Sequence, residues 1–258
     1  MNLKYLIGLI LATPLLPLMY YQGRRIRASI PQLPEAKEPC GESVHNGSDR
    51  LINLMVIGES TIAGVGVSTH TEGFAGTLAN ELSERWSANI RWNVYAKSGY
   101  TARLVENKIL PQIPDDQPDL IVLGLGGNDA FGLRSPAHWA NDITSLIAVL
   151  RARFGRAPIV FTNMPPIKEF PAFTGLMKFT IGNLVEMFGE RLITIAAQSE
   201  GVHYSSEVIT IDKWAQRLNI EKDVSAFFSD GVHPSRLTYQ TWARDLGRFI
   251  DDKVKLKL

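Results

Sequence analysis

The sequence predicts an α/β protein in which a parallel β-sheet is covered by helices on both faces. Beyond residue 50, short continuous apolar runs alternate with longer stretches whose apolar residues recur at helical spacing. The apolar runs are not interrupted by polar residues, which is typical of strands buried on both faces of a parallel sheet. With 258 residues and 45% hydrophobic composition, the chain can form one domain of this class.

Five strands and five helices are expected in alternation. The strands are predicted at residues 51–58, 90–99, 118–129, 157–166 and 201–206, and the helices at residues 73–86, 101–110, 135–155, 174–197 and 235–254. The helix over 135–155 has the clearest start, because Ser135 is a favoured N-cap residue and Pro136 suits the first helical position. Parallel sheets form their sites at the carboxyl ends of strands, so functional residues are expected directly after the strands.

The N-terminal residues differ in composition from the rest of the chain. Residues 5–21 carry no charge, and as a helix they would be about 25 Å long, short but usable for a bilayer core of about 30 Å. Only Lys4 precedes the run and no cleavage-like site follows it, which favours a membrane anchor over residues 1–22 rather than a cleaved signal peptide. Arg24, Arg25 and Arg27 lie beyond the run, which favours a domain on the cytoplasmic face; export remains the alternative.

The composition also indicates the domain boundaries and limits which partners and bound metals are expected. Residues 23–50 are rich in Pro, Gly and polar residues and are expected to tether the anchor to a domain of residues 51–258. The net charge of +1 argues against a nucleic-acid partner. Cys40 is the only cysteine, so neither an internal disulfide nor a cysteine-based zinc site is expected. The sequence does not indicate an oligomeric state.

Polar or small residues follow the first three predicted strands. Ser60 comes after the first strand, Gly99 lies at the end of the second, and Asn128 lies at the end of the third. Acyl transfer by serine needs a hydroxyl, a base, a group that orients the base, and donors for the oxyanion. A backbone N–H at Gly99 and the amide of Asn128 could serve as such donors. Taken alone, however, Ser60 could simply be the N-cap of the next helix.

Asp230 and His233 stand three residues apart just before the last predicted helix. This spacing lets one short turn supply both a histidine and the carboxylate that fixes its tautomer. A metal-binding pair is the alternative, but no further ligand cluster accompanies it.

Four motifs follow one another through the domain: GES at 58–60, SG at 98–99, GGND at 126–129 and DGVHPS at 230–235. In this combination the chain resembles the SGNH hydrolases, also called the GDSL-type lipase and esterase family. The resemblance implies a three-layer α/β/α flavodoxin-like fold. It implies Ser60 as nucleophile, His233 as base and Asp230 as the acid that orients it. The implied oxyanion hole consists of the Ser60 and Gly99 N–H groups and the Asn128 side chain, with no metal or organic cofactor.

Two positions depart from the family pattern. Glu59 stands where the family commonly has Asp, and Thr61 stands where leucine is frequent. Neither change removes a group from the expected chemistry. We interpret Glu59 as an acid that orders the loop, and assign no catalytic role to Asp129.

The expected function is hydrolysis of carboxylic esters through an acyl-enzyme. A membrane anchor and the apolar side chains of residues 163–179 would suit an acyl-lipid or lysophospholipid ester, although that segment could instead pack a helix against the sheet. Phe227 and Phe228, close to Asp230, are expected to border the site. Carbohydrate O-deacetylation and thioester hydrolysis use the same groups and are the near alternatives. A binding module without turnover is the alternative from a different class.

Overall fold

The computed structural model of the protein describes residues 5, 8, 10, 12–220 and 223–256. In these residues a six-stranded sheet has the order β1-β3-β2-β4-β5-β6. The strands are β1 (Cys40–Ser43), β2 (Leu51–Gly58), β3 (Asn89–Ala96), β4 (Leu120–Gly124), β5 (Ile159–Phe161) and β6 (Val202–Tyr204). All neighbouring strands pair in parallel except β1, which is antiparallel to β3 at one edge. Without β1, the order is that of flavodoxin-like sheets.

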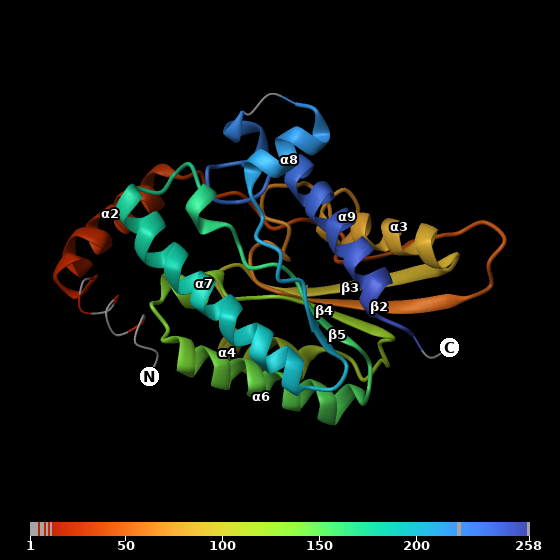
Figure 1. Ribbon diagram of the computed structural model, residues 1–258. Helices are drawn as coiled ribbons and strands as arrows, with labels where there is room; N and C mark the ends of the chain where they lie inside the picture. Colours follow the sequence, from red (N-terminus) through yellow and green to blue (C-terminus); the bar gives the residue numbers. More distant parts are fainter. Residues whose placement is uncertain (1–4, 6–7, 9, 11, 221–222, 257–258) are drawn as a thin grey trace.

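Helices cover both faces of this sheet (Figure 1). They are α2 (Leu16–Ser29), α3 (Phe74–Trp86), α4 (Ala102–Leu104), α5 (Gly127–Phe131), α6 (Pro136–Phe154), α7 (Gly175–Gln198), α8 (Ile211–Leu218) and α9 (Arg236–Lys253). Shorter helical segments are η1 (Thr13–Leu15), η2 (Val105–Ile109), η3 (Leu110–Gln112), η4 (Ile167–Glu169) and η5 (Val224–Phe227). α3 and α9 pack together on one face, and α4, α6 and α7 lie on the other. The predicted α/β class is therefore confirmed.

The elements form where the sequence pattern predicts them for identifiable reasons. Every residue of β4 is buried, as expected for an uninterrupted apolar strand in the middle of a parallel sheet. α6 begins at Pro136, and the Ser135 side chain accepts a hydrogen bond from the His138 N–H at 3.4 Å. The predicted start of this helix is thus confirmed.

The predicted membrane anchor over residues 5–21 is wrong. Among the described residues, no helix is long and apolar enough to cross a bilayer. Parts of the expected anchor, at residues 1–4, 6–7, 9 and 11, lie outside the described residues. The predicted attachment of the domain to a membrane, on either face, depended on this anchor and is therefore wrong as well.

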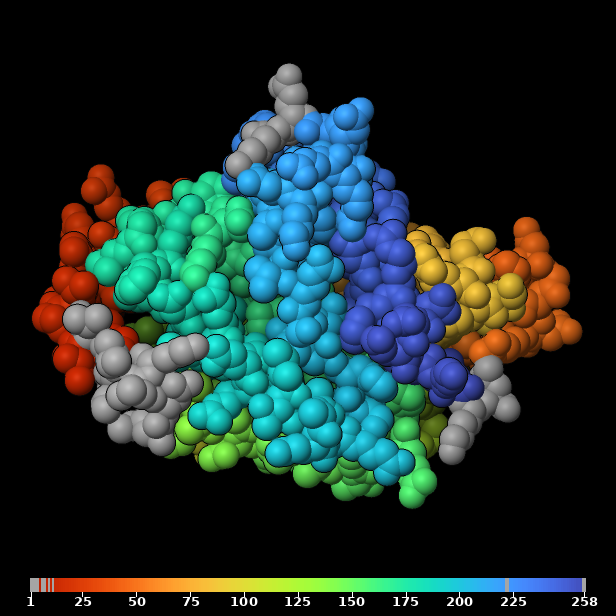
Figure 2. All heavy atoms as spheres, viewed as in Figure 1, coloured from red at the N-terminus to blue at the C-terminus, as the bar shows by residue number. Residues whose placement is uncertain are grey.

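The physical reason is visible in α2, which is not the hydrophobic helix that was expected. It packs on the domain through Met19, which is 7% exposed, while its arginines face solvent. Gln22 of α2 accepts a hydrogen bond at 2.8 Å from the hydroxyl of Thr174, which precedes α7. In Figure 2 the N-terminal segment, in red, lies at the edge of the molecule beside the start of α7.

Strand β1 lies inside the segment that was expected to be a tether. Its sequence, CGES, has no apolar pattern, and the strand forms because it pairs with the edge of β3. A Cβ on Gly41 would lie 2.4 Å from the Trp92 ring, so only glycine lets the two strands approach at this point. The sheet therefore extends into residues 23–50.

Candidate active site

Three loops with predicted site residues leave the sheet at one edge. Gly58, at the end of β2, is paired in register with Ala96 of β3 and with Gly124 of β4. Because these parallel strands end in line, the loops that follow them lie side by side. One loop carries the predicted nucleophile, and the other two carry the predicted oxyanion donors.

Ser60 is half-buried at the start of a series of turns after β2. The next helix, α3, begins at Phe74 and has Gly73 at its N-cap position, so Ser60 is not a helix cap. The Ser60 carbonyl accepts a hydrogen bond from the Val65 N–H at 3.1 Å, which closes one of these turns. None of the described residues forms a hydrogen bond with the Ser60 hydroxyl.

The Glu59 carboxylate ties the loop after β2 to the loop after β4. Its Oε1 accepts the Gly127 N–H at 2.8 Å, and its Oε2 accepts the Asn128 N–H at 2.9 Å. Glu59 is only 5% exposed. This burial raises the pKa of its carboxyl to about 7, although the two amide hydrogen bonds act in the opposite direction. Glu59 therefore orders the loop that carries Asn128.

Two neighbouring side chains then tie this loop to the one after β3. Asn128 Nδ2 donates to the Tyr100 carbonyl at 3.0 Å, and the same side-chain amide also interacts with the Glu59 carboxylate. Asp129 Oδ2 accepts the Ala102 N–H at 2.9 Å. Burial raises the pKa of the Asp129 carboxyl to about 6, against the effect of that hydrogen bond. This role of Asp129 was not predicted from the sequence, because no local pattern indicates a partner 27 residues earlier.

Gly99 lies at the tip of a turn formed by residues 97–100. The Tyr100 N–H donates to the Lys97 carbonyl at 3.2 Å, and Gly99 has a φ of 83°, as at the third position of a type II turn. This conformation favours glycine. Apart from its two chain neighbours, no described residue has an atom within 4 Å of the position a Cβ would take, so Gly99 faces open space.

Asp230 and His233 are brought together by one short turn before α9. Asp230 Oδ2 lies 2.7 Å from His233 Nδ1, and Oδ1 accepts the Val232 and His233 N–H groups at 2.9 and 2.7 Å. Burial alone would raise the pKa of Asp230, but the hydrogen bonds from His233 and Val232 outweigh it and hold that pKa below its usual value. An ionised carboxylate can only accept, so the shared hydrogen belongs to Nδ1 and Nε2 is left to take a proton.

The loops of Ser60 and His233 meet at one cavity of about 50 Å³. It is lined by the residues on either side of Ser60 and of His233, namely Glu59, Thr61, Val232 and Pro234. The Tyr239 hydroxyl, at the start of α9, donates to the Val65 carbonyl at 2.8 Å and so fastens the two regions together. Ser60 and His233 are not hydrogen-bonded to each other here; such bonds are often long until substrate binds.

The sequence pattern of the GDSL-like lipase/acylhydrolase family matches residues 56–241, which contain every predicted site residue. The chain belongs to this family. The match confirms the resemblance that the four motifs indicated, and membership implies an ester hydrolase.

Relatives of this GDSL-like hydrolase include the esterase TesA of Pseudomonas aeruginosa, which is 26% identical over 125 residues. That match covers 44% of this chain and 55% of TesA, so it spans about half the length of this relative. The crystal structure of phospholipase A1 from Streptomyces albidoflavus NA297 has 17% identity and a TM-score of 0.52, covering 76% of this chain and 98% of that one. An acetylxylan esterase from Geobacillus stearothermophilus has 14% identity and a TM-score of 0.57, covering 83% and 98%. These two structures establish the fold alone.

A row of aromatic rings crosses this side of the GDSL-like hydrolase. Phe170 contacts Phe228 and Phe173, with ring centroids 5.4 Å apart in both pairs, and Phe173 contacts Phe131 at 5.7 Å. Phe131 ends α5, the helix of Asn128, and Phe228 lies just before the turn of Asp230 and His233. The row therefore joins the loop of the predicted oxyanion donor to the loop of the predicted base.

Side chains of residues 163–179 are divided between a cavity wall and the core. Met164 and Phe170 line the small cavity, whereas Met177, in the first turn of α7, is buried in the core. Phe228 also lines that cavity, but Phe227 is fully buried and stacks on Trp214 instead.

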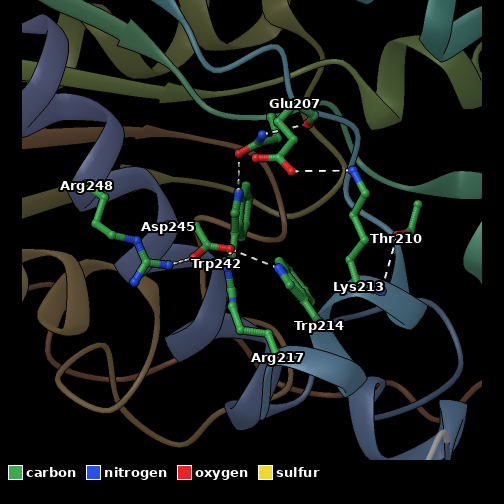
Figure 3. A network of polar contacts seen from close by, with 9 residues as sticks. Glu207, Thr210, Lys213, Trp214, Arg217, Trp242, Asp245 and Arg248 are labelled. Atoms are coloured by element: carbon green, nitrogen blue, oxygen red, sulfur yellow. Dashed lines mark hydrogen bonds and ion pairs between the residues drawn. The ribbon is translucent and has the colours of Figure 1, made fainter. Parts of the chain in front are cut away.

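A second cavity of about 260 Å³ adjoins the first. The two share the lining residues Asn163, Ile209, Trp214 and Trp242. Polar contacts fix its wall (Figure 3): Asp245 of α9 accepts hydrogen bonds from Trp214 Nε1 at 2.9 Å and from Arg217 at 2.8 Å, and it also pairs with Arg248. Helix α8 is thereby held against α9. Across the described residues, no group of three or more His, Cys, Asp or Glu side chains is arranged to hold a metal ion.

Proposed function

We propose that the protein is a serine hydrolase that cleaves carboxylic esters through an acyl-enzyme. The observation that carries this proposal is the Asp230–His233 pair, 2.7 Å apart, in a turn that shares a cavity with the loop of Ser60. A buried carboxylate that orients an imidazole near the loop of a serine is the arrangement that activates a hydroxyl as a nucleophile.

The first half of the reaction forms the acyl-enzyme. His233 Nε2 takes the proton of the Ser60 hydroxyl as its oxygen attacks the ester carbonyl carbon. The negative charge that develops on the carbonyl oxygen is received by the Ser60 and Gly99 N–H groups and by the side-chain amide of Asn128. His233 then passes its proton to the leaving alcohol as the carbon–oxygen bond breaks. Asp230 keeps the ring in the required tautomer and balances the imidazolium charge.

The second half releases the acid. His233 removes a proton from a water molecule, the resulting oxygen attacks the acyl carbon, and the same three donors hold the second oxyanion. The proton returns from His233 to the Ser60 oxygen, which leaves the carbon and restores the enzyme. The three donors come from three separate loops, and the contacts of Glu59 and Asn128 described above keep these loops in register before substrate arrives.

The acyl group of the substrate is proposed to be short. The cavity beside Ser60 is lined mainly by apolar residues, including Phe170 and Phe228. Its volume of about 50 Å³ is small beside the roughly 300–1,000 Å³ of sites that hold drug-sized ligands. We therefore expect acetyl to butyryl esters to be cleaved in preference to long-chain esters.

Hydrolysis of p-nitrophenyl esters by the full chain tests both parts of the proposal. We expect turnover of the acetate and butyrate that is lost in Ser60→Ala, and lower kcat/KM for the octanoate and palmitate. Absence of turnover by folded wild-type protein would favour a binding module. Highest activity on the palmitate or on a lysophospholipid would refute the short-chain assignment, and a preference for acetylated sugars or acyl-CoA would point to the deacetylase or thioesterase alternatives.

A further inference from the structure

Residues 35–39, called the strap below, lie outside the region that matches the family and run along the loop of Ser60. The Ala36 N–H donates to the Ala63 carbonyl at 2.9 Å, and the Lys37 N–H donates to the Ser68 carbonyl at 3.0 Å. The Lys37 carbonyl accepts the N–H of His70 at 3.0 Å. Three backbone hydrogen bonds therefore fix the strap to the loop that carries the proposed nucleophile.

The strap is packed tightly at this contact and is continuous with the sheet. Gly64 has a φ of 70°, and a Cβ on it would lie 2.6 Å from the Cβ of Ala36. At the other end of the strap, the Pro39 carbonyl accepts the Val94 N–H of β3 at 2.7 Å, and the chain then enters β1. Both ends of the strap are thus held by neighbouring backbone.

From this fixed position, Glu35 reaches the turn that carries Gly99. Its Oε1 accepts the Ser98 N–H at 2.7 Å, and its Oε2 lies 3.0 Å from Lys97 Nζ. The Glu35 side chain is 31% exposed, and its hydrogen bond with Ser98 lies at the surface. The carboxylate therefore joins the strap to the first half of the turn.

Gly99 lies between two anchors. Glu35 holds the N–H of Ser98, the residue before it, and Asn128 Nδ2 holds the carbonyl of Tyr100, the residue after it, at 3.0 Å. The turn itself is exposed, and beyond its two chain neighbours no described residue comes within 4 Å of where a Gly99 Cβ would be, so packing does not set its orientation. The direction of the Gly99 N–H then depends on these two hydrogen bonds, on the turn's own backbone bond, and on the bond from the Lys97 N–H to the Gly58 carbonyl at 3.3 Å.

We propose that Glu35 is a positioning residue that sets the orientation of the Gly99 N–H in the oxyanion hole. This inference rests on the proposed function. It gives the N-terminal strap a part in catalysis: the strap links the loop of the nucleophile to one of the loops of the oxyanion donors. Glu35 acts through the Ser98–Gly99 peptide and does not itself touch the substrate.

The test compares variants of the full chain in steady-state hydrolysis of p-nitrophenyl butyrate. Removing a whole oxyanion donor costs about 10²–10³ in turnover, so misdirecting one of three donors should cost less. We expect Glu35→Ala to lower kcat by about tenfold with KM changed less than about twofold. Glu35→Gln keeps an acceptor for the Ser98 N–H and should restore kcat to within about threefold of wild type.

Two further variants separate the hydrogen bond from its surroundings. Lys97→Ala removes the ion pair but leaves the bond to Ser98, and should stay within about twofold of wild type because exposed ion pairs contribute little. Glu38→Ala removes another carboxylate of the strap, one that forms no hydrogen bond or ion pair with the described residues, and should also leave kcat unchanged. Amide hydrogen exchange at Ser98 should become faster in Glu35→Ala alone of these four.

The outcomes distinguish this inference from the function on which it rests. If wild type turns over and Ser60→Ala does not, while Glu35→Ala has wild-type kcat, the ester hydrolase stands and the role of Glu35 is refuted. Equal losses of kcat in Glu35→Ala and Glu38→Ala would also refute the role of Glu35, since they would indicate a general effect on the strap. If folded wild type has no turnover, the proposed function fails and the role of Glu35 fails with it.

Discussion

The buried carboxyl of Glu59 leads to a prediction about stability and pH. Its pKa is raised from 4.5 to about 7 by burial, while hydrogen bonds from the Asn128 and Gly127 amides act against that rise. Between these two pH values the folded protein holds a proton that the unfolded chain has lost, so the free energy of unfolding falls as pH rises through this window. The full change corresponds to about 3 kcal/mol, complete above pH 7.

The substitution Glu59→Gln isolates this effect. Glutamine does not titrate, and like the neutral acid it offers one carbonyl oxygen to the two amides. At pH 4.5 the free energies of unfolding of the two proteins should therefore differ by no more than about 1 kcal/mol. Between pH 4.5 and pH 8.5 the free energy of unfolding of Glu59→Gln should rise by about 3 kcal/mol relative to that of wild type, because only the wild type buries a charge.

Urea unfolding of both proteins at several pH values between 4.5 and 8.5 measures this difference, because other titrating groups are common to both. Glu84→Gln, which changes an exposed glutamate of α3, is the control and should follow the wild-type profile. A difference that stays constant with pH would show that the pKa of Glu59 is not raised. A relative gain for wild type at high pH would show that the two amide hydrogen bonds outweigh burial.

Three further substitutions test the site and its supports. Asn128→Ala should lower kcat by about 10²–10³ with little change in KM for p-nitrophenyl butyrate, and a loss below tenfold would remove its amide from the oxyanion hole. Asp230→Asn should lower kcat by about 10³–10⁴-fold in the same assay, because the amide no longer enforces the His233 tautomer. A near-normal rate would show that Asp230 is not needed to orient His233. Tyr239→Phe should lower the free energy of unfolding by about 1–3 kcal/mol in urea, because it leaves the buried Val65 carbonyl without its donor. Tyr20→Phe, on the exposed side of α2, serves as its control and should have no effect.

The local parts of the fold were predictable because their causes are local in sequence. β4 is recognisable from its continuous apolar residues, and the start of α6 from Ser135 and Pro136. The contact of Asp230 with His233 was also expected, since three residues of separation fit one turn. In each case the interacting groups lie within a few residues of one another.

The parts that sequence could not supply depend on contacts between distant residues. Asp129 binds the Ala102 N–H, and Glu35 binds the Ser98 N–H 63 residues away, although neither acid belongs to a pattern that indicates its partner. Strand β1 exists only because the edge of β3 is available to it.

The membrane-anchor prediction from the N-terminal apolar run was wrong for a related reason. Its apolar residues had two possible destinations, a bilayer or the protein itself, and composition does not distinguish them. In the described residues, Met19 is buried against the domain, and α2 continues through three arginines. The helix therefore has one side packed on the protein and another side at the surface. An apolar run next to a domain with a free surface is therefore weak evidence for a membrane anchor.

Reaction with a fluorophosphonate, followed by mass spectrometry of the digested protein, tests most directly whether Ser60 is the nucleophile. The account predicts a single adduct on the peptide that contains Ser60, no adduct in folded Ser60→Ala, and much slower labelling in His233→Ala. Labelling of Ser60→Ala at the wild-type rate, or an adduct mapped to another residue, would contradict it.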